Sequence, residues 1–97
     1  MPLGTSATTT LPVDRLGDAV DALRGFGFHD HRVDEDARIM TKPGNRFALR
    51  GHQRPLAARL AECDEGVELE LRYDQWLVFD SGELTRHAQR IADSLAR

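Results

Sequence analysis

Residues Val67–Tyr73 read VELELRY, and this stretch decides the fold class because apolar and charged side chains alternate along its whole length. In an extended chain successive side chains point to opposite faces of the sheet, so one face of the stretch is apolar and the other is charged. A strand of this kind belongs to a sheet that is packed on one side and open to solvent on the other. The stretch therefore predicts a mostly antiparallel sheet with one covered face.

The preceding segment, Leu56–Cys63, can be interpreted in two ways. With a period of 3.6 its Leu and Ala residues form a helical stripe behind Pro55, and with a period of two they form one face of a strand. Asp64–Gly66 suits a three-residue hairpin loop with Gly in the left-handed position, and a hairpin needs a strand on both sides. We therefore predict a strand here, although periodicity alone leaves the helix open.

Five further segments predict the remaining strands, each bounded by residues that favour turns. They are Thr5–Leu11, Phe28–Val33, Arg38–Lys42, Arg46–Gly51 and Trp76–Phe79. Thr8–Thr10 favours an extended strand in the first of them, because β-branched residues pack well on a pleated sheet. Lys42–Asn45 has Pro at its second and Gly at its third position, as type II turns favour. Connections this short join antiparallel neighbours.

The segment from Val13 to Gly25 has the periodicity of an amphipathic helix. Leu16, Val20 and Leu23 recur at helical spacing, while acidic residues occupy the other face. Gly25 and Gly27 end this helix, because glycine accepts the left-handed cap conformation at little cost.

A second amphipathic helix is predicted over Glu83–Leu95, with Asp80 and Glu83 arranged as a capping box. The predicted order is β-α-β(about 6)-α. This is an α+β fold in which an antiparallel sheet packs against an N-terminal helix and a long C-terminal helix. Residues 5–97 form a single α+β domain, because a chain of 97 residues has room for one hydrophobic core. We expect residues 1–4 to form a disordered N-terminus.

Composition and charge exclude several classes of partner. The chain has 13 basic and 16 acidic residues, a formal net charge of −3, so we expect no nucleic-acid partner. Lys42 is the single lysine among many arginines, a bias typical of GC-rich bacterial genomes. No apolar run approaches the ~20 residues that cross a bilayer, so we expect no membrane span. The single cysteine, Cys63, and the lack of a signal peptide in Met1–Thr10 predict a cytoplasmic protein.

The order of segments resembles a known fold. Thr8–Pro12 running into a helix, the strand Val67–Tyr73, and Trp76–Phe79 leading into Glu83–Leu95 resemble a compact version of the helix-grip fold. That fold is found in the START-like superfamily, which includes polyketide cyclases and lipid-transfer domains. The resemblance is one of topology over most of the chain, and it transfers no functional residue because the superfamily has no short invariant motif. It implies a ligand held between the sheet and the C-terminal helix.

His29 and His31 form the most suggestive pair of polar residues. Two residues apart on a strand share a face, so both imidazoles could approach one metal ion. A third ligand would have to come from His52 or His87, and neither is indicated by its spacing. We therefore interpret this segment as a solvated edge strand and expect no metal and no cofactor.

Cys63 and His87 each allow a functional and a structural interpretation. No histidine near Cys63 in the sequence would activate it, so we expect a small core side chain and not a nucleophile. His87 lies within the apolar stripe of the last helix. It is interpreted as a half-buried, hydrogen-bonded boundary residue, with contact to a ligand as the alternative.

Three classes of function remain open. The first is a small non-enzymatic protein that binds an apolar or amphipathic small molecule between the sheet and the C-terminal helix. Its predicted ligand-binding residues are Leu49, Leu69, Tyr73, Trp76, His87 and Ile91. The alternative is a protein-interaction or structural module, a homodimer or a binder of a protein partner, that uses a strand edge or the solvated sheet face. No catalytic residue is predicted, and an enzyme acting through the histidines is the weakest hypothesis.

Overall fold

The computed structural model describes residues 6–44, 55–73 and 83–96. In chain order the elements are β1 (Ser6–Leu11), α1 (Leu16–Gly25), β2 (His29–Asp34), β3 (Ala37–Lys42), β4 (Leu56–Cys63), β5 (Gly66–Tyr73) and α2 (Glu83–Leu95). The α+β prediction is confirmed, and Leu56–Cys63 is a strand as expected. Four predictions lie outside the described residues: the strands Arg46–Gly51 and Trp76–Phe79, the capping box at Asp80, and the disordered residues 1–4.

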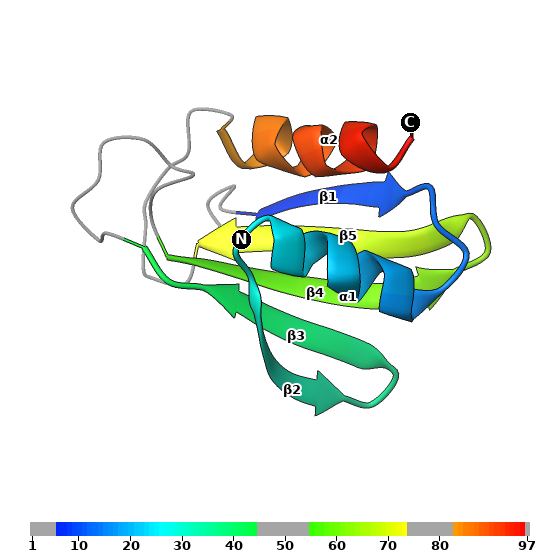
Figure 1. Ribbon diagram of the computed structural model, residues 1–97, viewed down its shortest axis with the longest axis horizontal. Helices are drawn as coiled ribbons and strands as arrows, with labels where there is room; N and C mark the ends of the chain where they lie inside the picture. The colour runs from blue at the N-terminus through cyan, green and yellow to red at the C-terminus, as the bar shows by residue number, and fades with distance from the viewer. Residues whose placement is uncertain (1–5, 45–54, 74–82, 97) are drawn as a thin grey trace.

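The five strands form one antiparallel sheet in the order β1-β5-β4-β3-β2 (Figure 1). Strands β2 to β5 follow each other as a meander, whereas β1 lies beside β5 at the opposite edge from β2. Helix α1 therefore crosses from one edge of the sheet to the other over a single face. This order leaves β1 and β2 as the two edge strands.

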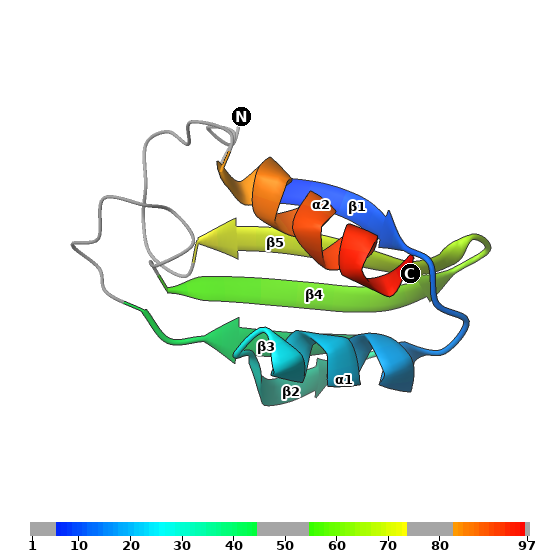
Figure 2. The ribbon, with the colours of Figure 1, turned by 45° about the horizontal axis from the view of Figure 1, so that its top comes forward.

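Both helices lie on the same face of the sheet (Figure 2). The alternation of VELELRY is realised as expected: Val67, Leu69 and Leu71 are fully buried beneath the helices, and the charged residues between them face away. Leu60 of β4 and Ile91 of α2 join the same hydrophobic cluster. Each such side chain contributes roughly 1.5–3 kcal/mol to folding when it is fully buried. The sheet thus has a covered face and a helix-free face.

Helix α1 ends in a Schellman motif. The N–H of Phe28 donates to the carbonyl of Leu23 and the N–H of Gly27 donates to the carbonyl of Arg24, both at 3.0 Å. Gly27 has a φ of +95°, so the left-handed position expected of glycine is at Gly27, while Gly25 is still helical. Phe28 is 1% exposed and packs in the core beside Leu23 instead of starting the next strand.

The start of α1 and the β4–β5 turn both differ from the predictions. Helix α1 begins at Leu16 and not at Val13, and the Leu16 N–H donates to the Glu62 carboxylate of β4 at 3.0 Å. The β4–β5 loop has two residues in place of three, because Gly66 already pairs with Cys63 as the first residue of β5. Gly66 has a φ of +140°, a conformation that L-residues with a side chain rarely adopt.

Candidate functional site

Four of the six predicted ligand-binding residues converge on the layer between β5 and α2. Leu69 and Ile91 are fully buried, Tyr73 is 8% exposed and His87 is 5% exposed. They meet because β5 presents alternate residues to α2, while His87 and Ile91 lie one helical turn apart. The other two, Leu49 and Trp76, lie outside the described residues.

His87 is more deeply buried than predicted. The sequence suggested a half-buried boundary residue, but within the described ranges His87 is the one polar or charged residue whose side chain is buried. Its imidazole meets the ring of Phe26 edge to face, with ring centroids 6.1 Å apart and planes at 87°. Phe26 caps the end of α1. The α1 terminus therefore covers the imidazole, a tertiary contact that the helix periodicity of α2 could not indicate.

The helix-free face has a regular arrangement of side chains that follows from the strand register. Its middle row, read from β1 to β2, consists of Thr8, Glu70, Arg59, Ile39 and Arg32. The next row toward the start of β4 consists of Ser6, Arg72, Ala57, Thr41 and His29. In the second row the short side chains of Ala57 and Thr41 thus lie between longer polar side chains on β5 and β2.

Two overlapping hollows occupy this face. One has a volume of about 210 Å³ and includes Asp34, Arg59 and Glu70 in its lining. The other has a volume of about 320 Å³ and is lined by His31, Arg32, Ile39, Thr41, Ala57 and Arg72. Both share the floor of Ile39 and Ala57, and Ala57 is 5% exposed.

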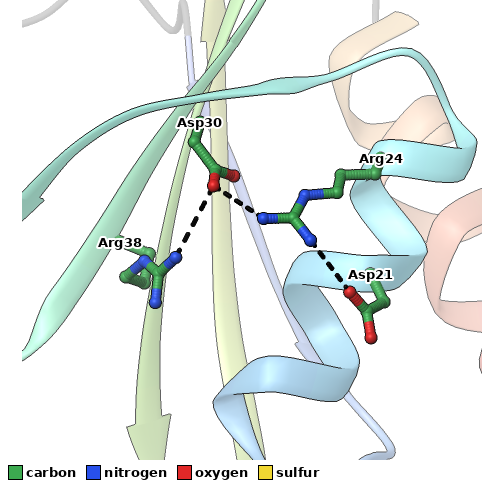
Figure 3. Close-up of polar contacts among 4 residues, drawn as sticks. All are labelled: Asp21, Arg24, Asp30 and Arg38. Carbon is green, nitrogen blue, oxygen red and sulfur yellow. Dashed lines mark hydrogen bonds and ion pairs between the residues drawn. The ribbon is translucent and has the colours of Figure 1, made fainter.

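The arginines on the two faces of the sheet differ in whether they form ion pairs with carboxylates. On the covered side, the Asp30 carboxylate accepts a hydrogen bond from Arg24 Nη2 at 2.6 Å and lies 3.8 Å from Arg38 Nη2 (Figure 3). Arg24 Nη1 also contacts Asp21 at 3.2 Å. On the helix-free face, Arg32, Arg59 and Arg72 form no ion pair with any described residue.

The Asp30 contacts shift the titration of both partners. The hydrogen bond from Arg24 holds the pKa of the Asp30 carboxyl below its ordinary value, and the charges of Arg24, Arg38 and His29 act in the same direction. The same hydrogen bond and the charge of Asp30 raise the pKa of Arg24. This cluster ties the C-terminal part of α1 to β2 and β3.

The remaining candidate residues do not assemble into a reactive centre. His29 pairs with Thr41, and His31 lines the larger hollow on the same face, but no group of three potential metal ligands occurs among the described residues. Cys63 is exposed, so the prediction of a core side chain is wrong. It is the last residue of β4 and shares the helix-free face with Arg59 and Ala57, so neither helix covers it.

Apart from His31, sequence reasoning did not single out the residues around the larger hollow. Ala57 and Thr41 carry no recognisable motif, and Arg32 and Arg72 could not be distinguished from other surface arginines. The register between strands brings these residues together. Strand β2 also contains an irregularity between Asp30 and Arg32, which no sequence pattern predicted. The signals in the sequence were the pair of His29 and His31 and the charged half of VELELRY, which contains Arg72.

The chain matches no family model, no curated protein and no solved structure. No helix within the described ranges is both long and apolar enough to cross a bilayer. The geometry of the two sheet faces is therefore the basis for assigning a function.

Proposed function

We propose that this protein is a small non-enzymatic binding protein that holds an apolar or amphipathic small molecule in the layer between β5 and α2. The observation that supports this proposal is that Tyr73 belongs to the hydrophobic cluster between sheet and helices, while His87 is buried against the ring of Phe26. Small-molecule sites are mostly apolar and contain a few polar groups that orient the ligand. Tyr73 and His87 each combine an apolar ring with a polar tip, so both suit that role.

The position of the two residues also suits a binding site. Tyr73 is the last residue of β5, and His87 lies within the first turns of α2, so both are near one end of the layer. Leu69 and Ile91 lie deeper along the same two elements and are fully buried. A ligand would enter at the Tyr73 end and place its polar group there, with its apolar part toward Ile91.

An amide NMR titration tests this proposal. Labelled protein is titrated with palmitate and with 2-naphthol, and we expect shifts concentrated at Tyr73, His87 and Ile91. His87→Leu keeps the site apolar but removes the polar tip, and it should weaken 2-naphthol binding about fivefold, the effect of losing roughly one hydrogen bond.

Gln89→Leu is the matched control, because Gln89 is exposed on the same helix. This variant should bind 2-naphthol as the original protein does. The proposal is wrong if neither compound shifts these amides up to its solubility limit, or if both variants lose affinity equally.

A second candidate function, self-association through β1, is favoured by a difference between the two edge strands. Strand β2 carries charged residues and a register irregularity between Asp30 and Arg32, features that discourage pairing with another strand. Strand β1 contains no charged residue and pairs with β5 over six consecutive positions without a shift. A second copy of the chain could add its own β1 in antiparallel orientation across a two-fold axis.

Sedimentation of charged edge variants tests this candidate. Thr8 and Thr10 are exposed on β1, and changing both to Lys should convert a dimer to a monomer, because charged side chains oppose strand addition. Val33→Lys is the control at the β2 edge, where Val33 is 66% exposed. A dimer disrupted by Val33→Lys alone, or a protein that is monomeric at millimolar concentration, would rule out the β1 interface.

We also propose a cytoplasmic location and a helix-grip topology for the complete chain. The single cysteine supports the first, because a protein without disulfides is typical of a reducing compartment. The element order from β1 to α2 supports the second. Cell fractionation tests the location. An experimental structure without strands at 46–51 and 76–79 would argue against the topology.

A further inference from the structure

The helix-free face offers a candidate binding site that is separate from the layer beneath α2. We propose that the hollow of about 320 Å³ on this face binds a small amphipathic carboxylate, with Arg32 and Arg72 holding the carboxylate and Ile39 and Ala57 contacting the apolar part. The proposal goes beyond the function proposed above, because it concerns the opposite face of the sheet.

The floor of the hollow is formed by uncharged side chains on the neighbouring strands β3 and β4. Ala57 and Thr41 are cross-strand partners, and Ile39 is two residues from Thr41 on the same face. Arg72 lies directly opposite Ala57 on β5, and Arg32 lies directly opposite Ile39 on β2. Long basic side chains therefore flank a shallow apolar surface. This arrangement suits an amphipathic anion, because the basic side chains contact its charged group and the apolar surface contacts its apolar part.

The irregularity in β2 supplies a second wall residue. In a regular strand His31 and Arg32 would point to opposite faces of the sheet. The register shifts between Asp30 and Arg32, and both His31 and Arg32 line the same hollow. Bulges commonly re-aim a side chain in this way next to binding sites. The effect here is to place an imidazole next to a guanidinium on one wall.

The charges of the lining select an anion. Arg32 and Arg72 have no ion-pair partner among the described residues, and none of the six lining residues is acidic. A guanidinium binds a planar carboxylate through two parallel hydrogen bonds. Two unpaired guanidinium groups beside an apolar floor therefore favour a carboxylate over a neutral or cationic ligand of the same shape.

Acidic residues at the opposite end of the same face would orient the ligand. The β2–β3 turn and the β4–β5 turn lie at that end, with Asp34, Glu35, Asp36, Asp64 and Glu65 in or beside them. Glu68 and Glu70 lie on β5 on the same face, on the side of Arg72 that is toward these turns, and Glu70 and Asp34 line the overlapping smaller hollow. Their combined field repels an anion, so the carboxylate is directed to the Arg72 end.

The test compares 2-naphthoate with its neutral analogue 2-naphthamide in an amide NMR titration of the full chain. We expect 2-naphthoate to shift the amides of Thr41, Ala57 and Arg72, and 2-naphthamide to bind at least about tenfold more weakly. Arg72→Gln should weaken 2-naphthoate binding by a similar factor. Ala57→Leu fills the floor and should also abolish the shifts, provided that the amide spectrum of the covered face is unchanged.

Arg86→Gln is the control, because Arg86 is exposed on α2 and its removal changes the net charge equally. Equal losses in Arg72→Gln and Arg86→Gln would overturn the proposal, since they would indicate attraction by overall charge. Equal affinity for 2-naphthoate and 2-naphthamide would overturn it as well. Shifts at Tyr73 and Ile91 without shifts at Ala57 would support the layer beneath α2 and overturn the helix-free site.

Discussion

Gly66 lies where any side chain would collide with the main chain. A Cβ atom placed on Gly66 would be 2.4 Å from the carbonyl oxygen of Leu11 and 3.1 Å from that of Val13. Both oxygens belong to the backbone, one at the last residue of β1 and one just after it, so neither can turn aside as a flexible side chain would. The positive φ of Gly66 adds a conformational cost for any other residue.

We expect Gly66→Ala to lower the free energy of unfolding by about 2–3 kcal/mol, because it combines backbone strain with a steric clash. Urea denaturation measures the change. Gly17→Ala is the matched control, since Gly17 is helical and a Cβ atom placed on it would have no neighbouring atom within 4 Å. That variant should gain about 0.5 kcal/mol from helix propensity. Similar losses in both variants would contradict this account.

At the same scale, the Asp30 carboxylate links protonation to stability. Its pKa is lowered in the folded protein, chiefly by the hydrogen bond from Arg24, so the folded state favours the ionised form. The stabilisation is fully present above the ordinary Asp pKa of about 3.9 and is lost as the pH falls through the lower folded value.

We therefore expect Asp30→Asn to be less stable than the original protein at pH 7, with the difference disappearing under strongly acidic conditions. The free energy of unfolding as a function of pH measures this. Asp64→Asn is the control, because Asp64 is exposed in a turn. A difference between Asp30→Asn and the original protein that stays constant with pH would show that the carboxylate charge is not involved.

At the scale of elements, α1 depends on a partner that is distant in the sequence. Its N-cap residue, Arg15, makes no side-chain capping bond, and the first helical N–H is satisfied by Glu62 of β4 instead. A carboxylate at this position also interacts favourably with the positive end of the helix dipole. The contact ties the start of α1 to β4, while the Asp30 cluster ties its end to β2 and β3 (Figure 3).

We expect Glu62→Ala to lower the free energy of unfolding by about 1 kcal/mol, the usual effect of losing an N-terminal cap. Glu65→Ala is the control, since Glu65 is exposed in the neighbouring turn, and it should change stability by less than about 0.5 kcal/mol. Thermal unfolding of the two variants distinguishes them. Equal stabilities would indicate that water caps α1 as effectively as Glu62 does.

At the scale of the whole molecule, burial is distributed unevenly across the sheet. Strand β4 is flanked by β3 and β5 and lies beneath α1, whereas β2 has one neighbouring strand and all six of its residues are exposed. Strands β1 and β5 lie beneath α2 (Figure 2), so the last described element of the chain packs against the first. Local opening is therefore easiest at β2.

We expect native-state hydrogen exchange to follow this gradient. The amides of β4 and β5 should exchange only through global unfolding, while those of β2 should exchange through a local opening of lower free energy. A series of exchange measurements in low urea separates the two processes. Equal protection of β2 and β4 would mean that the sheet opens as a single unit.

The sequence by itself determined the elements whose side-chain period is uninterrupted. VELELRY defined β5 and its covered face, and the apolar spacing of Glu83–Leu95 defined α2. An element that is buried on one side has apolar residues at a regular spacing, and this spacing is visible in the sequence of the element alone. Tertiary structure alone decided what depends on contacts between distant segments. These are the cap of α1 by Glu62, the burial of His87 beneath Phe26, and the hollow formed by Arg32, Ala57 and Arg72. No repeating pattern in the local sequence predicts these three features, because each arises from the register and packing of elements that are far apart in the chain.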